Sequence, residues 1–285
     1  MSGKKRSWFG IFLNLLISAV FLAGIGLFLY PTVSNWINTR RMNRSVAAYE
    51  KTVEGLPEAE RRTLLQQARD YNRRLKDNPS PYSEKSRTEG YQGTLIAGGS
   101  GIMGYVMIPK IRVRLPFYHG TEEDVLQTAI GHLEGSSLPV GDPGEHAVLS
   151  AHRGLPSAKL FTDLPELVIG DTFVLTVLDR EMVYEVDQIL TVQPDSQEAI
   201  EAILPVEGED LVSLMTCTPY GVNTHRLLVR GHRSGDVVHA TEENGTVNGT
   251  VDSGSSFDRY IPYISAAAAV IYLALWLMLV KKRKE

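Results

Sequence analysis

Two long apolar segments, one near each end of the chain, constrain its fold more than any other feature. Residues 8–30 carry no charged side chain and one asparagine, and residues 261–280 form a second uncharged run. A helix needs roughly 20 apolar residues in a row to cross a bilayer. Both segments meet that length, so we expect two transmembrane helices with the rest of the chain between them.

The charges beside these segments predict the orientation of the chain. Lys and Arg next to a span favour the cytoplasmic side, and residues 281–284 are all basic. Residues 4–6 are basic too, but arginines within residues 40–44 balance them across the first span. We let the stronger asymmetry of the second span decide. No small-residue cleavage pattern follows the first span, so it reads as an uncleaved anchor, with both termini cytoplasmic and the region between them extracellular.

These features divide the chain into an ordered set of expected segments. Leu56 and Pro57 should split the helical part into two helices, because proline suits the first turn of a new helix. The segments are a cytoplasmic basic N-terminus (1–7), a transmembrane signal anchor (8–30), an extracellular helical segment (31–76), a loop (77–103), a β-rich domain (104–239), a flexible linker (240–259), a transmembrane helix (260–280) and a cytoplasmic basic tail (281–285).

The central region has the pattern of a mainly β domain. Short runs rich in β-branched and aromatic residues recur there, each followed by turn residues, as in YVMIP, IRVRLPFY, HAVLSAH, TFVLTVL, MVYEVDQIL, LVSLMTC and RLLVRGH. Strands at this spacing favour a closed or nearly closed barrel, with residues 122–133 and 194–204 as helical or turn inserts. Composition alone does not separate a barrel from a sandwich.

Composition and charge exclude several classes of protein. The formal net charge is −4, with 33 acidic against 29 basic residues, which gives no basic surplus for a nucleic-acid partner. The chain has one cysteine and seven histidines. An intramolecular disulfide is therefore excluded, and no metal-ligand spacing such as C-x-x-C or H-E-x-x-H occurs. We expect no metal and no cofactor, and look for partners among peptides and the membrane.

The single cysteine lies in the most informative stretch, residues 211–233, which reads LVSLMTCTPYGVNTHRLLVRGHR. Two apolar runs flank a loop that contains proline, glycine and asparagine, which predicts a strand, a turn and a returning strand. Cys217 then ends the first strand and Arg226 begins the second, so antiparallel pairing brings them within reach of each other. A cysteine thiolate beside a cation that offers hydrogen-bond donors to an oxyanion suits covalent catalysis.

The same residues carry a family resemblance. SLMTCTPYGVNTHRLLVRG resembles the active-site hairpin of the sortases, in particular the class C, pilus-assembling kind, with Ser213 where threonine is usual. AVLSAHRGLPSAKLFTDL at 147–164 is similar to the family's histidine segment and carries His152. The resemblance extends almost continuously over residues 104–233. It implies a sortase-type eight-stranded β-barrel with N-terminal helices, here flanked by two transmembrane helices.

The resemblance also implies a reaction. Class C sortases are cysteine transpeptidases: the cysteine, here Cys217, attacks the threonine carbonyl of an LPxTG-like sorting signal and forms a thioester. His152 would carry the proton and Arg226 would bind the oxyanion or the peptide. The acyl group then passes to a lysine amine of a pilin, with hydrolysis as a side reaction. The expected location is the cell membrane of a Gram-positive-type bacterium.

Other functions remain open at this point. A related sortase would anchor surface proteins to the cell wall instead of polymerising pilins. A membrane-anchored cysteine protease would use the same cysteine and histidine, although papain-like and caspase-like signatures are missing. A third possibility is a non-enzymatic adaptor with a vestigial site. The second span and the loop before the barrel favour pilus assembly.

Several residues near the proposed site compete for its roles. Arg153 and His225 each neighbour a chosen residue, and adjacent residues of a strand point to opposite faces, which argues against them. No third catalytic carboxylate is assigned. The remaining candidates weighed are His132 and His146 for the proton carrier, and Asp142, Asp163 and Asp171 for orienting it.

The loop before the barrel resembles the lid of class C sortases, which carries an Asp-Pro-aromatic motif. Here the motif reads Ser80-Pro81-Tyr82. Ser80 is neutral and cannot form the ion pair with Arg226 that an aspartate would form. The closed lid should therefore be less favoured, unless Asp77 or Glu84 provides the carboxylate. Pro81 should fix the turn, and Tyr82 is expected to pack over or near the thiol.

Overall fold

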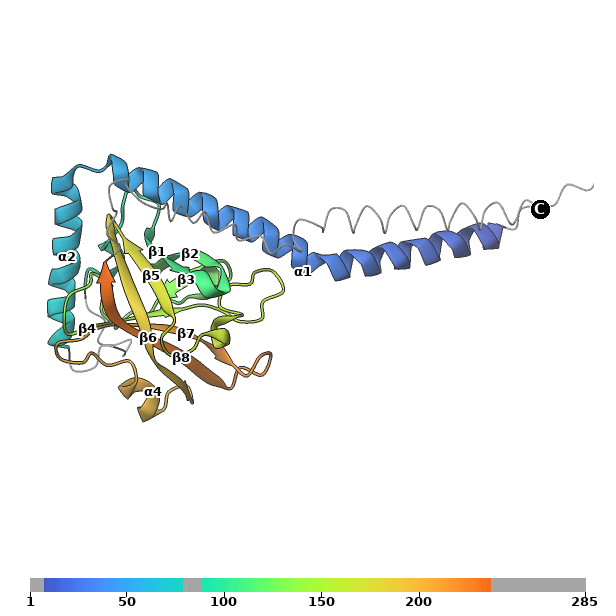
Figure 1. The fold of residues 1–285 in the computed structure, drawn as a ribbon. Coiled ribbons are helices and arrows are strands. Elements are labelled where there is room, and N and C mark those ends of the chain that lie inside the picture. The colour runs from blue at the N-terminus through green and yellow to red at the C-terminus, as the bar shows by residue number, and fades with distance from the viewer. Residues whose placement is uncertain (1–7, 79–81, 83–88, 237–285) are drawn as a thin grey trace, which may run out of the picture. The chain divides into compact units, whose positions relative to one another are not determined.

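The computed structural model describes residues 8–78, 82 and 89–236 (Figure 1). The expected linker (240–259), second transmembrane helix (260–280) and both basic termini (1–7 and 281–285) lie outside the described residues. Ser80 and Pro81 of the expected lid lie outside them as well.

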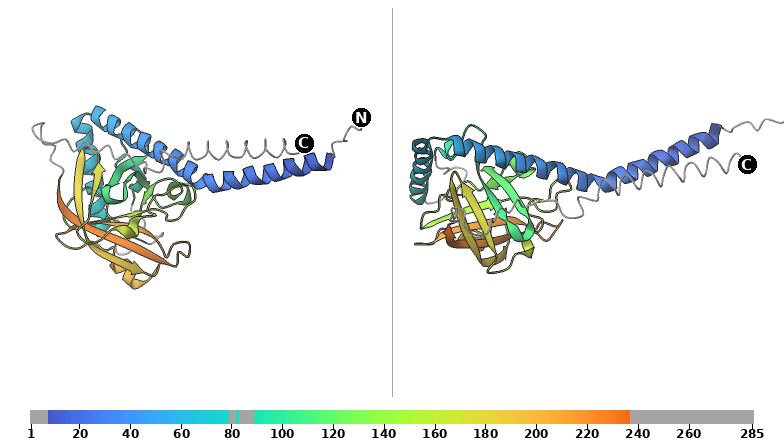
Figure 2. Two further views of the ribbon diagram at one scale, coloured as in Figure 1. Left: turned by 45° about the vertical axis from the view of Figure 1, so that its right-hand side comes forward. Right: turned by 45° about the horizontal axis from the view of Figure 1, so that its top comes forward.

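Two helices precede the barrel, α1 (Trp8–Gly55) and α2 (Glu58–Lys76). The interruption between them lies at Leu56 and Pro57, where the sequence predicts it. α1 runs without a break through the apolar segment, with Pro31 inside it. Proline removes one backbone donor from a helix and favours a bend, and α1 bends near its middle (Figure 2). Among the described helices, α1 alone has the length and apolar composition to cross a membrane.

Eight strands close into a barrel in the order β1-β2-β3-β4-β7-β8-β6-β5. Pairing is parallel between β2 and β3 and between β4 and β7, and antiparallel elsewhere. The strands are β1 (Ile102–Ile108), β2 (Val113–His119), β3 (Ile130–His132), β4 (Glu145–Ser150), β5 (Thr172–Val177), β6 (Arg180–Val192), β7 (Asp210–Thr218) and β8 (His225–Asp236). The expected eight-stranded barrel with N-terminal helices is confirmed.

Short helices fill the connections, and one insert differs from its expected form. Residues 122–133 contain α3 (Glu123–Leu126), as expected of an insert, but also strand β3, which the sequence analysis missed. The insert at 194–204 contains α4 (Gln197–Glu201). The described residues also form the 3₁₀ helices η2 (Tyr91–Gly93), η3 (Pro109–Ile111) and η4 (Leu164–Glu166).

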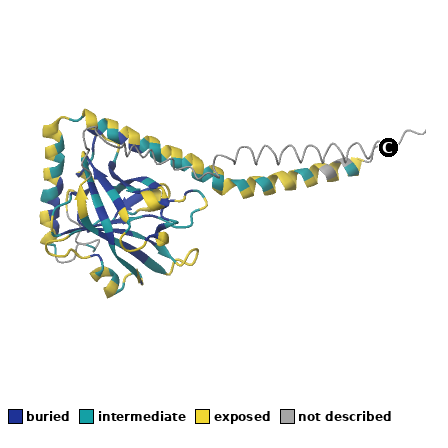
Figure 3. Ribbon diagram, viewed as in Figure 1, coloured by how far each residue is buried: buried dark blue, intermediate teal, exposed yellow. Residues whose placement is uncertain are grey.

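The hydrophobic core fills the barrel, where large side chains such as Phe117, Phe161 and Phe173 are fully buried. Each such side chain stabilises the fold by about 2–3 kcal/mol relative to an exposed position. Buried residues gather on the strands, whereas the apolar first part of α1 is exposed (Figure 3). Water would oppose that exposure, so the pattern fits a helix whose first part lies in lipid.

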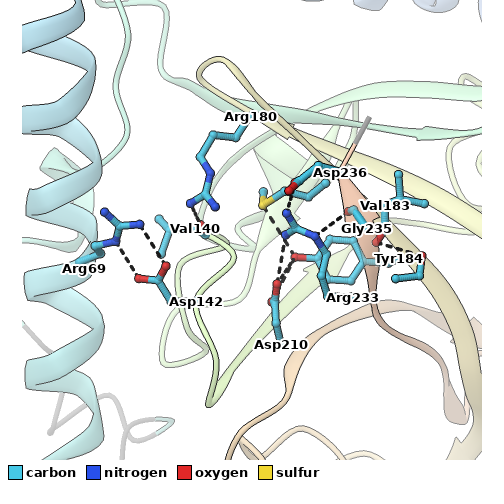
Figure 4. A network of polar contacts seen from close by, with 12 residues as sticks. Arg69, Val140, Asp142, Arg180, Val183, Tyr184, Asp210, Arg233, Gly235 and Asp236 are labelled. Atoms are coloured by element: carbon cyan, nitrogen blue, oxygen red, sulfur yellow. Dashed lines mark hydrogen bonds and ion pairs between the residues drawn. The ribbon is translucent and has the colours of Figure 1, made fainter. Parts of the chain in front are cut away.

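Both helices are fixed to the barrel by buried polar contacts. On α1, the Tyr49 hydroxyl donates to the Met103 carbonyl at 3.0 Å and accepts from the Leu178 N–H at 2.7 Å. On α2, the Asn72 amide donates to the Leu138 carbonyl and accepts from its N–H, at 2.9 and 2.8 Å. Arg69 forms a two-point ion pair with Asp142 (Figure 4).

Candidate active site

Strands β7 and β8 bring Cys217 and Arg226 opposite each other. The register pairs Cys217 directly with Arg226, and Thr218 with His225. The turn between the strands is closed by the N–H groups of Val222 and Asn223, which donate to the Pro219 carbonyl at 3.1 and 3.0 Å. Asn223 adopts a φ of 60°, which asparagine tolerates better than most residues. The turn sequence therefore sets the pairing that the hairpin pattern predicts.

The two side chains are half-buried, and Arg226 keeps donors available. Its Nη1 atom lies 3.4 Å from the Asn223 carbonyl and 3.3 Å from the His225 carbonyl, which are long hydrogen bonds. Within the described part of the chain, no Asp or Glu forms an ion pair with Arg226. A guanidinium in this setting can hold a carbonyl oxygen of a peptide.

His152 reaches the same place from strand β4. The parallel register with β7 pairs Ser150 with Met215. The two segments stay side by side beyond that pair, because the Thr216 hydroxyl donates to the Ala151 carbonyl at 2.8 Å. Continuing the register sets His152 beside Cys217, and directly paired residues of adjacent strands face the same side of a sheet.

Arg153, the next residue along, supports this alignment. Its Nη1 atom lies 3.3 Å from the Thr218 hydroxyl, and its guanidinium lies over the ring of Tyr220. Arg153 is thus beside Thr218, one step beyond His152 and Cys217. It is engaged by its neighbours, as the alternation of side chains predicts.

The imidazole of His152 has few partners of its own. Its Nε2 atom is buried and has no hydrogen-bond partner among the described residues. The nearest carboxylate oxygen, Oε2 of Glu123 in α3, lies 3.6 Å away. Glu123 could not be identified from the sequence. A charged residue in a short helix gives no local signal that it will approach a histidine 29 positions later.

The other histidines are engaged elsewhere. His146 Nδ1 lies 3.0 Å from the Leu204 carbonyl and His146 Nε2 lies 2.8 Å from the Ser213 hydroxyl. The carbonyl accepts only, so Nδ1 carries the proton and Nε2 accepts from Ser213. Burial lowers the pKa of His146 to about 4. Ser213 therefore has a structural partner, which explains why a hydroxyl residue is suitable there.

His132 and His225 are likewise occupied. His132 is fully buried, with Nδ1 2.8 Å from the Tyr91 hydroxyl, and burial lowers its pKa to about 4. His225 lies 2.9 Å from the Thr224 hydroxyl, on the turn. Of the four histidines considered, His152 is the one that continues the register beside Cys217.

The three aspartates considered as orienting groups are paired with cations. Asp142 binds Arg69. The other two pairs are Asp163 with Lys159 and Asp171 with Lys110. Within the described ranges, no three His, Cys, Asp or Glu side chains gather closely enough to hold a metal ion.

An apolar cluster lies beside the thiol on the same face of the sheet. Met215 and Leu228 are each two residues from Cys217 and Arg226, and side chains two apart on a strand share a face. The cluster buries Val148, Val192, Ile203 and Leu228, with Tyr82, Leu133, Leu190, Ala199, Ala202 and Met215 packed against it. The cluster extends from α4 to Met215, two residues before Cys217.

Tyr82 is the residue of the expected lid that the structure describes. Its ring packs against this cluster, and its hydroxyl donates to the Ile203 carbonyl at 3.2 Å. Burial raises the pKa of Tyr82 to about 12. Tyr82 is therefore held on the face that carries Cys217, close to α4. That its ring covers the thiol stays a prediction.

Known proteins resemble this chain in sequence and in fold. A family model described as the sortase domain matches residues 106–234. Sortase D of Bacillus subtilis is 34% identical over 133 residues, which cover 46% of this chain and 63% of that protein. The match thus spans less than two thirds of that curated relative.

Solved structures match over most of their length. Sortase C1 of Streptococcus agalactiae is 46% identical, with a TM-score of 0.62, and the match covers 67% of this chain and 98% of that one. Sortase C of Streptococcus pneumoniae is 42% identical, with a TM-score of 0.57, over 66% of this chain and 95% of that one. The chain therefore belongs to the sortase family, with streptococcal sortases C among its solved relatives.

Proposed function

We propose that this protein is a membrane-anchored cysteine transpeptidase that cleaves an LPxTG-like sorting signal and joins it to an amine. The observation that supports the proposal is the strand register: β7 and β8 pair Cys217 with Arg226, and the register of β4 with β7, continued two residues past Ser150, would set His152 beside Cys217. A thiol, a guanidinium with no carboxylate partner among the described residues and an imidazole without a strong partner there are the groups that acyl transfer needs.

In the first step, the Cys217 sulfur attacks the carbonyl carbon between the threonine and glycine of the signal. Arg226 donates to the oxyanion that develops on that carbonyl. His152 gives a proton to the glycine amine as the peptide bond breaks, which leaves a thioester on Cys217.

In the second step, an amine attacks the thioester. His152 takes a proton from the incoming amine, the new amide bond forms, and Cys217 leaves as its thiolate. Water in place of the amine gives hydrolysis, which is the expected side reaction.

We assign the amine to a lysine of a pilin subunit, so the product is an isopeptide bond between pilins. The class C resemblance of the hairpin supports this assignment. Sortase C of Streptococcus pneumoniae, a solved relative, has been described with respect to pilin substrate specificity. The apolar part of α1 supports an anchor in the cell membrane, and the basic residues 281–284 favour a barrel on the outer side.

Tyr82 supports a lid over the substrate face. Its ring packs against the apolar cluster near Cys217. The side chains of a bound peptide would lie on the same face of the sheet. A peptide would then displace Tyr82 before it reaches the thiol. The neutral Ser80 provides no ion pair with Arg226, so the lid should open more readily than one with aspartate there.

The test uses the full chain in detergent micelles with an LPxTG peptide, with and without a lysine-containing acceptor peptide. Mass spectrometry should find a released fragment that begins with glycine, and an acceptor joined through its lysine side chain. Cleavage with no joined product at any acceptor concentration would identify a protease. Transfer of the signal to the amine of a cell-wall peptide, but not to the lysine-containing acceptor, would identify a wall-anchoring sortase.

A further inference from the structure

Two asparagines of α1 contact the loop that follows β4. The Asn35 side-chain oxygen accepts from the Lys159 N–H at 2.8 Å, and the Asn38 side-chain amide donates to the Ser157 carbonyl at 2.6 Å. Asn35 and Asn38 are three residues apart, which puts them on the same face of the helix. Together they hold a short stretch of loop backbone from both sides.

The partners fix the chemistry of each contact. A backbone N–H only donates and a carbonyl only accepts, so Asn35 must present its oxygen and Asn38 its amide nitrogen. Both asparagines are half-buried. The residues around the contact therefore shield these hydrogen bonds from part of the solvent.

The loop that the two asparagines contact is itself hydrogen-bonded to His152 and to Gly154. The Phe161 N–H donates to the His152 carbonyl at 3.2 Å, and the Gly154 N–H donates to the Thr162 hydroxyl at 3.2 Å. The side chain of Phe161 is fully buried in the core. Phe161 and Thr162 thus fold back onto His152 and Gly154, so residues 153–163 form a loop that is hydrogen-bonded at its base.

The position of His152 depends on this loop. His152 lies beyond the last residue of β4, and its Nε2 atom has no hydrogen-bond partner among the described residues. The backbone on either side, together with Glu123 Oε2 3.6 Å from Nε2, therefore positions the ring. A shift of the loop would move the imidazole relative to Cys217.

The contact lies close to the expected membrane surface. Tyr30 is the last residue of the apolar segment 8–30, and Asn35 is five residues further along α1, which is about 8 Å along a helix axis. Between the two asparagines, Trp36 carries the Arg40 guanidinium 4.1 Å from its ring centroid. Tryptophan and arginine are residues that gather at the bilayer surface.

We propose that Asn35 and Asn38 are positioning residues that hold loop 153–163, and through it His152, so that the anchor helix is part of the catalytic scaffold. The proposal rests on the role of His152 in the proposed transpeptidase. It assigns the juxtamembrane part of α1 a role beyond tethering.

The same substitution should impair the protein at position 38 and leave it nearly unchanged at position 35. Asn38→Asp replaces the donor with a carboxylate oxygen that faces the Ser157 carbonyl, whereas Asn35→Asp keeps an acceptor for the Lys159 N–H. In the full chain in detergent micelles, we expect Asn38→Asp to lower kcat for transfer by about three- to tenfold, the effect of losing one hydrogen bond. KM should change less than twofold, and Asn35→Asp should stay within twofold of wild type.

Hydrogen exchange gives a second measurement that needs no activity. Asn38→Asp and Asn35→Leu should each speed exchange of the backbone amides of residues 157–161, and Asn35→Asp should not. Gln67→Glu is the control, because Gln67 is an exposed amide on α2 and undergoes the same kind of change. It should alter neither kcat nor exchange in the loop.

Two results would overturn the proposal. One is unchanged exchange at residues 157–161 in both Asn38→Asp and Asn35→Leu. The other is a wild-type kcat for Asn38→Asp although exchange has increased, which would separate the loop from His152. A wild-type protein that forms no thioester would instead reject the proposed function, and the exchange data would still decide whether the asparagines hold the loop.

Discussion

Strand β8 carries one arginine at each end, and the two guanidinium groups have different partners. Arg233, near the end of β8, binds Asp210 at the start of β7 at 3.1 Å, and also binds Asp236 (Figure 4). Arg226, at the start of β8, lies opposite Cys217 at the end of β7. It has no carboxylate partner within the described part of the chain.

The difference shows how one pair of strands serves two purposes. At the Arg233 end, the donors are used within the protein: Arg233 Nε binds the Gly235 carbonyl at 2.7 Å and the Tyr184 hydroxyl lies 3.1 Å from Asp210. Such an end contributes stability. At the Arg226 end, the donors form only long hydrogen bonds among the described residues, which suits the proposed role of Arg226 in binding a substrate.

The largest expected effect is at the Arg226 end. Cys217→Ala and His152→Ala should each reduce transfer of an LPxTG peptide below detection, because one removes the nucleophile and the other the proton carrier. The free energy of unfolding should change by less than about 1 kcal/mol, since both residues are half-buried at strand ends. Peptide transfer and urea denaturation measure the two effects. Substantial transfer by Cys217→Ala would remove the assigned nucleophile.

Matched substitutions of the two arginines test the comparison itself. Arg226→Lys should lower kcat/KM by about two orders of magnitude, as for loss of an oxyanion donor, with little change in stability. Arg233→Lys should keep the activity and lower the free energy of unfolding by about 1–2 kcal/mol, because lysine cannot replace the fork of donors. Similar losses of activity in both variants would contradict the division of the two ends.

Glu145, at the start of β4, extends the comparison to pH. It is 5% exposed, and its Oε2 atom has no hydrogen-bond partner among the described residues. Burial, with a smaller contribution from Asp142, raises its pKa to about 7. In the unfolded chain a glutamate titrates near pH ~4.3. The folded state therefore binds more protons between these values, and stability should fall as the pH rises from about 4 to 7.

Glu145→Gln should remove this slope. Above pH 7 the variant should be more stable than wild type by about 1–3 kcal/mol, and near pH 4 the two should be alike. Activity should not change, since Glu145 lies at the end of β4 away from His152. Thermal unfolding across the pH range measures the effect. If stability depends on pH in the same way in both proteins, Glu145 does not hold a proton in the folded state as described.

The smallest expected effect concerns Tyr82. Tyr82→Ala should speed alkylation of Cys217 by up to about fivefold, the change expected when a weak closing contact is lost. Tyr82→Phe keeps the ring and loses the hydrogen bond to Ile203. Its alkylation rate should lie between those of the wild type and Tyr82→Ala. Ser80→Asp should slow labelling if it pairs with Arg226. Equal rates in all four proteins would remove the lid from the mechanism.

Much of the fold follows from local patterns in the sequence. Pro57 predicts the break between α1 and α2, and the alternating runs predict seven of the strands. β3 was missed because Ile130–His132 is short, contains a glycine and follows a helical turn. Its pairing with β2 and β4 is a property of the closed barrel and has no local signal.

The site was predictable in part for the same reason. Cys217 and Arg226 are joined by a tight turn, so their pairing can be read from the hairpin. His152 required the family resemblance, because its approach depends on parallel pairing of β4 with β7. The contacts of Asn35 and Asn38 join residues more than a hundred positions apart, and no pattern in either segment indicates them.

We propose that Cys217, at the Arg226 end of the β7–β8 pair, carries the acyl group during the reaction. The most direct measurement is mass spectrometry of the full chain after incubation with an LPxTG peptide, without an acceptor, and quenching in acid. We expect an added mass on Cys217 equal to the acyl group of the peptide up to its threonine, which hydroxylamine releases. The adduct should be reduced in Arg226→Lys and retained in Arg233→Lys. Cleavage of the peptide with no adduct on Cys217, and at an equal rate in Cys217→Ala, would contradict this proposal.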